Sequence, residues 1–183
     1  MKSPLYILKL ALTLLVITSC VALALAGVNY LTKDIIASIQ ADKLQAAIEE
    51  VLPGGGEKLP AEAYTDETKL VSAVYAGENG YAVEVKPMGF NGEITMMVGV
   101  SSEGKVLGIA VVSQAETAGL GAEAAANSNK GQAFRDQFVG LNGNLAVGND
   151  GGVIDAISGA TITSRAVVEG VNAALACVKT IEG

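Results

Sequence analysis

The longest hydrophobic pattern is an apolar run near the N-terminus. Residues 10–28 (LALTLLVITSCVALALAGV) contain no charged side chain. As a helix rising about 1.5 Å per residue, this run just spans a hydrocarbon core about 30 Å thick. The pattern predicts a transmembrane helix over residues 10–28. Because Lys2 and Lys9 precede the run, residues 1–9 are expected in the cytoplasm and the rest of the chain outside it, although Lys33 partly balances this charge asymmetry.

Two other interpretations of the apolar run compete with this one. Ala24-Leu25-Ala26 resembles a signal-peptidase site, and cleavage there would leave a soluble exported domain. Ile17–Cys20 loosely resembles a lipoprotein box. A retained single-pass anchor is favoured because the run is longer than a usual signal core. Residues 21–25 also stay apolar where a lipoprotein would become polar.

The segment after the run changes from helical to alternating patterns. Apolar positions over 34–51 have helical spacing, and Pro53–Gly56 ends the pattern, so residues 29–56 are expected to form a connecting helix and a Gly-rich turn. Alternating apolar and polar positions then predict four strands in antiparallel pairs. These strands are expected at residues 69–76, 81–86, 93–101 and 105–113.

The last third of the chain predicts loops and helices. Residues 122–139 read as partly helical, residues 141–152 as a loop with one short apolar strand, and residues 154–157 as a final short strand. Residues 163–181 have one apolar face and predict a helix, with Thr163 or Ser164 as its N-cap. The expected fold class is therefore α+β: an N-terminal transmembrane helix, then one exported domain (residues 57–183) with a mainly antiparallel sheet and flanking helices.

Composition excludes several kinds of site. The chain has no histidine, which excludes a Ser-His-Asp triad, an imidazole-bound metal and a His-ligated haem. Its cysteines, Cys20 and Cys177, are too few for the usual iron–sulfur cluster and are expected to be buried structural thiols. No metal site and no catalytic residue are predicted. Any redox role would need an organic cofactor.

Charge narrows the possible partners. From Asp34 onward lie all nineteen acids and nine of the twelve bases, a net charge of −10. Such a surface repels phosphate backbones, so nucleic-acid binding is not expected. An anionic cofactor would be held better by a covalent bond than by charge.

The most informative segment is DAISGATITS, residues 155–164. It reads as a strand, a tight turn of small residues and the start of a helix. Gly159 and Ala160 leave the Thr161 hydroxyl uncrowded, and a helix N-terminus favours a phosphate in its first turn. An ordinary capped helix start would explain the same residues.

This segment matches the pattern D-x-x-[ST]-G-A-[ST] that flavin transferases recognise. It resembles the S-G-A-T motif of the FMN-binding subunits of Rnf complexes and of Na⁺-translocating NADH:quinone reductases. The resemblance implies that Thr161 carries FMN as a phosphodiester and that Asp155 is read by the transferase. The other residues that it places at the cofactor are Ser158, Gly159, Ala160, Ile162 and Thr163.

A second loop supports the same resemblance. Residues 116–121 (ETAGLG) are similar to the family's E-T-P-G-L-G loop, which lines the flavin, with Ala118 in place of proline. The resemblance implies cofactor contacts from Glu116, Thr117, Gly119, Leu120 and Gly121. Residues 88–92 (MGFNG) fit the family's glycine-rich turn, and no flavin contact is predicted there.

The short chain favours the RnfG family of the Rnf-type ferredoxin:NAD⁺ oxidoreductase over the related FMN-binding family of the quinone reductase. The resemblance implies a single-pass cell-membrane subunit that relays electrons while the assembly moves Na⁺ or H⁺, with no independent catalysis by this chain. Expected partners are the membrane, iron–sulfur and flavin subunits of the complex, together with a flavin transferase. The competing hypotheses are a non-redox, membrane-anchored flavin-binding regulatory domain and an anchor protein without cofactor.

Overall fold

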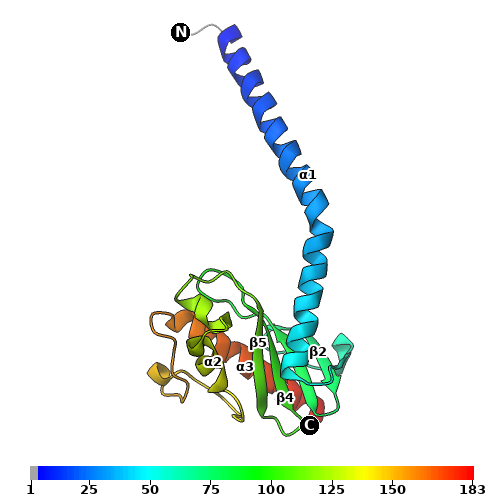
Figure 1. The fold of residues 1–183 in the computed structure, drawn as a ribbon, viewed down its shortest axis with the longest axis vertical. Coiled ribbons are helices and arrows are strands. Elements are labelled where there is room, and N and C mark those ends of the chain that lie inside the picture. Colours follow the sequence, from blue (N-terminus) through cyan, green and yellow to red (C-terminus); the bar gives the residue numbers. More distant parts are fainter. Residues whose placement is uncertain (1–3) are drawn as a thin grey trace. The chain divides into compact units, whose positions relative to one another are not determined.

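The computed structural model describes residues 4–183. The chain divides after Asp42 into two compact units, which are described separately. The first unit is the greater part of helix α1 (Pro4–Val51), drawn in blue and cyan in Figure 1. The structure thus joins the two helices predicted over 10–28 and 34–51 into one. Among the described residues, α1 is the one helix long and apolar enough to cross a membrane.

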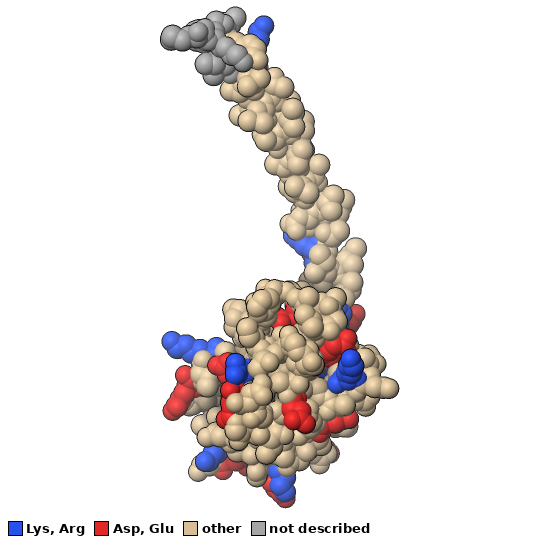
Figure 2. All heavy atoms as spheres, turned by 90° about the vertical axis from the view of Figure 1, so that its left-hand side faces the viewer, with Lys and Arg blue, Asp and Glu red and all other residues tan. Residues whose placement is uncertain are grey.

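Polar side chains within the apolar part of α1 are satisfied by the helix itself. The Thr13 hydroxyl donates to the carbonyl of Lys9 and the Thr18 hydroxyl to that of Leu14, both at 2.9 Å. A lipid environment requires such internal pairing because it offers no water to polar groups. Figure 2 shows a long stretch of this helix without acidic or basic side chains, whereas both kinds are scattered over the compact domain.

The second unit comprises residues 43–183 and is built on a five-stranded sheet in the order β1-β2-β3-β4-β5. Every neighbouring pair of strands is antiparallel. The strands are β1 (Glu57–Lys58), β2 (Val71–Gly77), β3 (Gly80–Val85), β4 (Thr95–Ser101) and β5 (Val106–Ser113). The four long strands match the predicted ones. The two-residue edge strand β1 was not predicted because so short a segment has no alternating pattern.

Both faces of the sheet are covered. Alternate residues such as Val83 and Val98 pack into the larger core with helix α3 (Thr161–Glu182). Their neighbours Ala82 and Met97 pack with the end of α1 on the other face, where Ala47, Ile48, Val51 and Leu52 are buried. The predicted α+β class is confirmed. The compact unit includes these last helical turns, so it begins earlier than residue 57, where sequence placed the domain start.

Glycine permits the close approach of α1 to the sheet. A Cβ at Gly99 would lie 2.4 Å from the carbonyl oxygen of Val51, and one at Gly77 would lie 2.5 Å from that of Gly55. Any larger residue at either position would have to displace backbone. The end of α1 is therefore a fixed part of the domain.

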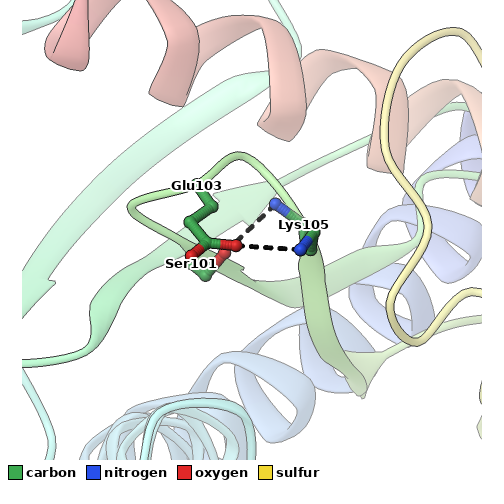
Figure 3. A network of polar contacts seen from close by, with 3 residues as sticks. All are labelled: Ser101, Glu103 and Lys105. Atoms are coloured by element: carbon green, nitrogen blue, oxygen red, sulfur yellow. Dashed lines mark hydrogen bonds and ion pairs between the residues drawn. The ribbon is translucent and has the colours of Figure 1, made fainter.

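The turn between β4 and β5 is closed by exposed polar contacts, drawn in Figure 3. The Lys105 ammonium lies 2.8 Å from the Glu103 carboxylate, and the Lys105 N–H donates to the Ser101 hydroxyl at 3.2 Å. The hydrogen bond and charge of Lys105 lower the pKa of Glu103. Because water screens so exposed a pair, it contributes little to stability.

Three predictions for the last third need correction. The segment expected to be partly helical forms the 3₁₀ turn η2 (Gly121–Ala125) and a shorter helix α2 (Asn129–Asp136), capped by the Ser128 hydroxyl. Residues 154–157 form no strand; Ile154 makes only an isolated parallel bridge to Val147. The other connecting elements are the 3₁₀ turns η1 (Ala61–Ala63) and η3 (Gly148–Asp150). Too few residues are free to pair around Ile154 for a ladder to extend.

Candidate functional site

The site is centred on the N-terminus of α3. This helix begins at Thr161, after Ala160 with φ −131° and ψ 42°, and no side chain of residues 4–183 caps it. The first N–H groups of a helix have no partner within the helix. The uncapped end of α3 therefore presents open donors and the positive end of the helix dipole, which together suit an anion.

The predicted N-cap is wrong because Thr163 and Ser164 have tertiary partners. Both side chains are buried in the first turn. The Thr163 hydroxyl donates to the Glu116 carboxylate. The Ser164 hydroxyl accepts from the Ile157 N–H at 3.0 Å and donates to the Ala160 carbonyl at 3.0 Å. Thr161 is half-buried and makes neither kind of contact, so its hydroxyl faces the site.

Glu116 joins three segments at this point. Its side chain is 9% exposed, and besides the Thr163 hydroxyl it accepts the Asn91 N–H at 2.9 Å. The Asn91 amide in turn donates to the Thr117 hydroxyl at 3.1 Å. We call Glu116, Asn91 and Thr163 the carboxylate clamp. It ties the turn at residues 88–92 and the loop at 116–121 to the start of α3.

Glycines make room for the clamp. A Cβ at Gly121 would lie 2.6 Å from a Glu116 carboxylate oxygen, and a Cβ at Gly89 would meet the other oxygen at 2.6 Å. Such distances are too short for any side chain but hydrogen. The glycines of the two loops thus serve the approach of a buried carboxylate.

A cavity of about 350 Å³ opens between the three clamped segments, and we call it the threonine cavity. Its size lies within the range typical of small-molecule sites. Nine of the residues that line it were predicted to contact the cofactor. They are Glu116, Thr117, Leu120, Gly121, Gly159, Ala160, Thr161, Ile162 and Thr163.

A neighbouring cavity of about 310 Å³, which we call the aspartate cavity, holds the other predicted residues: Gly119, Asp155 and Ser158. The two cavities meet where Leu120 approaches Gly159. A Cβ at Gly159, whose φ is +76°, would lie 3.0 Å from Leu120 Cδ2. A side chain at this position would be strained as well as crowded. The sequence motifs are thus divided between two adjoining sites.

The aspartate cavity has a charged lining. It includes Glu123 and Lys130 as well as the exposed Asp155. The backbone of Asp155 is fixed by the Gln137 side chain, which accepts its N–H at 2.7 Å and donates to its carbonyl at 3.2 Å. Gln137 thereby places the carboxylate of Asp155 at the surface of the domain.

One residue of the threonine cavity was missed from sequence. Phe90 lines it from the 88–92 turn and is 65% exposed. A large aromatic residue inside a glycine-rich turn was the signal that could have found it, because such a residue cannot be serving the turn.

Comparison with known proteins was informative over both units. Residues 89–176 match the sequence model of the FMN-binding domain, and residues 1–51 match that of the RnfG N-terminal region. A subunit of the Na⁺-translocating ferredoxin:NAD⁺ oxidoreductase complex of Acetobacterium woodii is 34% identical, over 91% of this chain and 88% of that protein. The chain belongs to the RnfG family of ion-translocating oxidoreductase subunits.

Two further relatives, which carry the same subunit letter, span a range of hosts. The one from the ion-translocating oxidoreductase complex of Methanosarcina acetivorans is 34% identical over 97% of both chains. The one from the proton-translocating ferredoxin:NAD⁺ oxidoreductase complex of Clostridium ljungdahlii is 38% identical over 60% of this chain and 61% of that protein. The predicted resemblance to the Rnf subunit is confirmed. With the apolar helix α1, it makes this chain a membrane-associated protein.

The matched regions fit the architecture. The N-terminal match ends at Val51, where α1 ends, and the FMN-binding match contains all residues that line the two cavities. Residues 52–88, which neither model matches, include β1, β2 and β3. The family-specific part of the domain is thus the half that holds the site.

Proposed function

We propose that this chain is the membrane-anchored electron-transfer subunit of an ion-translocating ferredoxin:NAD⁺ oxidoreductase complex and carries FMN bound through its phosphate to Thr161. The observation that carries this proposal is the position of Thr161. It is the first residue of an uncapped helix and lines a cavity of about 350 Å³. A phosphate on its hydroxyl would occupy the open end of the helix, where the N–H groups lack other partners.

The cavity suits the rest of the cofactor. Leu120 and Ile162 offer exposed apolar side chains beside Thr161, and the glycines at 121 and 159 let a flat ring approach the backbone. When bound, FMN supplies the one- or two-electron redox chemistry. The residues of this chain place the cofactor, shield it from water and, through the carboxylate clamp, keep the walls of the cavity in position.

Attachment would require a separate enzyme. Among the described residues, no cluster of His, Cys, Asp or Glu could hold a metal ion for such a reaction. Asp155 is exposed and held by Gln137, so a flavin transferase can reach it in the folded domain. The other partners would be the membrane, iron–sulfur and flavin subunits of the complex, and the chain would have no catalytic activity on its own.

The mass of the chain purified from its native membrane tests the proposal. After denaturation, the chain should retain its yellow colour and the mass of FMN less one water, and the modified peptide should contain Thr161. Other redox subunits should purify with it. Colour that is lost on denaturation would contradict the covalent bond. A flavoprotein that purifies without redox partners would instead favour the regulatory-domain hypothesis.

We expect Leu120→Asp to expose the flavin without releasing it. Leu120 is 42% exposed at the mouth of the threonine cavity, and it contacts neither Thr161 nor the carboxylate clamp through a hydrogen bond. A carboxylate here would admit water and add negative charge beside the ring, so the reduction potential should fall. Spectroelectrochemistry measures the potential. Leu107→Asp, at a similarly exposed residue outside both cavities, is the control. An unchanged potential in Leu120→Asp would remove this loop from the site.

We also expect the compact domain to lie outside the cytoplasm. Asn79 is exposed in the turn between β2 and β3, so Asn79→Cys should react with an impermeant maleimide in intact cells. Cys20→Ala removes the exposed native thiol. Cys177 can stay because burial raises its pKa to about 11 and keeps the thiol protonated and unreactive. Ser3→Cys, on the other side of the apolar run, should react only after lysis. The reverse pattern would invert the proposed topology.

A further inference from the structure

Phe90 is an exposed aromatic residue on a fixed support. The turn that carries it is closed by the Gly89 N–H, which donates to the Gly92 carbonyl at 2.8 Å. The next residue, Asn91, is held by the carboxylate clamp through its backbone and by Thr117 through its side chain. Phe90 is nevertheless 65% exposed. The protein thus fixes the backbone of an apolar side chain that it does not bury, which is typical of a surface meant to meet another group.

The two cavities differ in charge. The only charged side chain that lines the threonine cavity, among the described residues, is Glu116, and both of its carboxylate oxygens are engaged in the clamp. The aspartate cavity is lined by Glu123, Lys130 and Asp155. An uncharged aromatic ring is stabilised by apolar walls and loses less hydration there than among ionised groups. The threonine cavity is therefore the better site for the ring of a flavin, although a cofactor attached at Thr161 borders both.

We propose that Phe90 packs against the isoalloxazine ring, so that the FMN on Thr161 lies in the threonine cavity and not in the aspartate cavity. Thr161 and Phe90 line the same cavity from two segments that the carboxylate clamp holds together. Phe90 is a positioning residue, whose ring covers the flavin and limits its contact with water. This inference rests on the proposed covalent attachment of FMN at Thr161.

A tryptophan in place of Phe90 reports this contact directly. The chain contains no tryptophan, so an introduced one is a single reporter. An indole in contact with a flavin quenches flavin fluorescence by donating an electron to the excited ring, whereas a phenyl group does not. We expect Phe90→Trp in the full-length, FMN-loaded chain to lower the flavin fluorescence several-fold. Because Phe90 is exposed, the larger side chain needs no repacking of the core.

Two matched variants give this result its meaning. Ala133→Trp puts the same reporter at an exposed position that lines the aspartate cavity, and Val139→Trp puts it on the surface outside both cavities. Both should leave the fluorescence near that of the unsubstituted protein. Phe90→Ala should increase quenching of the flavin by iodide in solution, with the FMN mass retained. Strong quenching from Trp at 133 but not at 90 would place the ring in the aspartate cavity and overturn the inference.

The mass of each purified variant separates this inference from the attachment itself. If FMN is attached and fluorescence is the same in Phe90→Trp and Val139→Trp, the role of Phe90 is wrong while the attachment stands. If the unsubstituted chain carries no covalent FMN, both the attachment and the inference built on it are wrong.

Discussion

Thr161→Ala is expected to give a folded, membrane-bound chain that carries no covalent flavin. The Thr161 hydroxyl is half-buried in the threonine cavity and takes no part in the contacts that hold the turn. Its removal therefore leaves the clamp intact and deletes only the attachment point. Intact-protein mass spectrometry should show complete loss of the FMN mass, and circular dichroism should show the unsubstituted spectrum.

The neighbouring hydroxyls provide the controls. Thr163→Ala should keep the flavin but lose about 1–3 kcal/mol of stability, because it leaves the buried Glu116 carboxylate without one of its donors. Ser158→Ala should keep the flavin as well, since Ser158 is exposed and lines the other cavity. A Thr161→Ala protein that stays yellow after denaturation and washing would refute the central proposal.

Glu116→Ala is expected to be the most destabilising single change in the site. It removes the acceptor for both the Asn91 N–H and the Thr163 hydroxyl, and it opens a void between three segments. Unsatisfied buried donors and lost packing together should cost about 3 kcal/mol or more. The melting temperature of the detergent-solubilised chain should fall, and any flavin present should become accessible to iodide.

A more conservative pair of variants separates the clamp from its charge. Glu116→Gln preserves the shape of the side chain but offers one acceptor oxygen where two are used, so an intermediate loss of stability is expected. Glu103→Gln, at the exposed β4–β5 turn, makes the same chemical change and should not measurably alter the melting temperature. Equal melting temperatures for Glu116→Gln and the unsubstituted chain would show that the clamp does not hold the site together.

The strands were predictable because local alternation reports directly on burial. Along β3 and β4 every second residue enters the larger core, and the others face the end of α1. The apolar run was equally plain, since no other part of the chain lacks charges for so long. Two elements were less predictable. The pairing of β1 depends on β2 lying beside it, and Ile154 stays an isolated bridge because its neighbours turn away.

The N-cap prediction shows where sequence reasoning fails at the site. Thr163 and Ser164 have the right chemistry for a cap, and nothing local indicates that they do otherwise. Their partners are set by tertiary contact: Glu116 lies 47 residues before Thr163, and Asn91 lies 25 residues before Glu116. Only the folded chain brings these three together. The same contact explains why Phe90, in a turn that seemed to have no role, lines the cavity.

By itself the sequence determined the strands, the membrane-anchor pattern and the motif that singles out Thr161, because each of these is written in neighbouring residues. The tertiary structure decided which hydroxyls are used up by the fold and which one faces the cavity. It also divided the motif residues between two adjoining cavities and placed a buried carboxylate between three distant segments. The physical reason is that buried polar groups must find partners, and those partners come from whatever parts of the chain the core brings within reach.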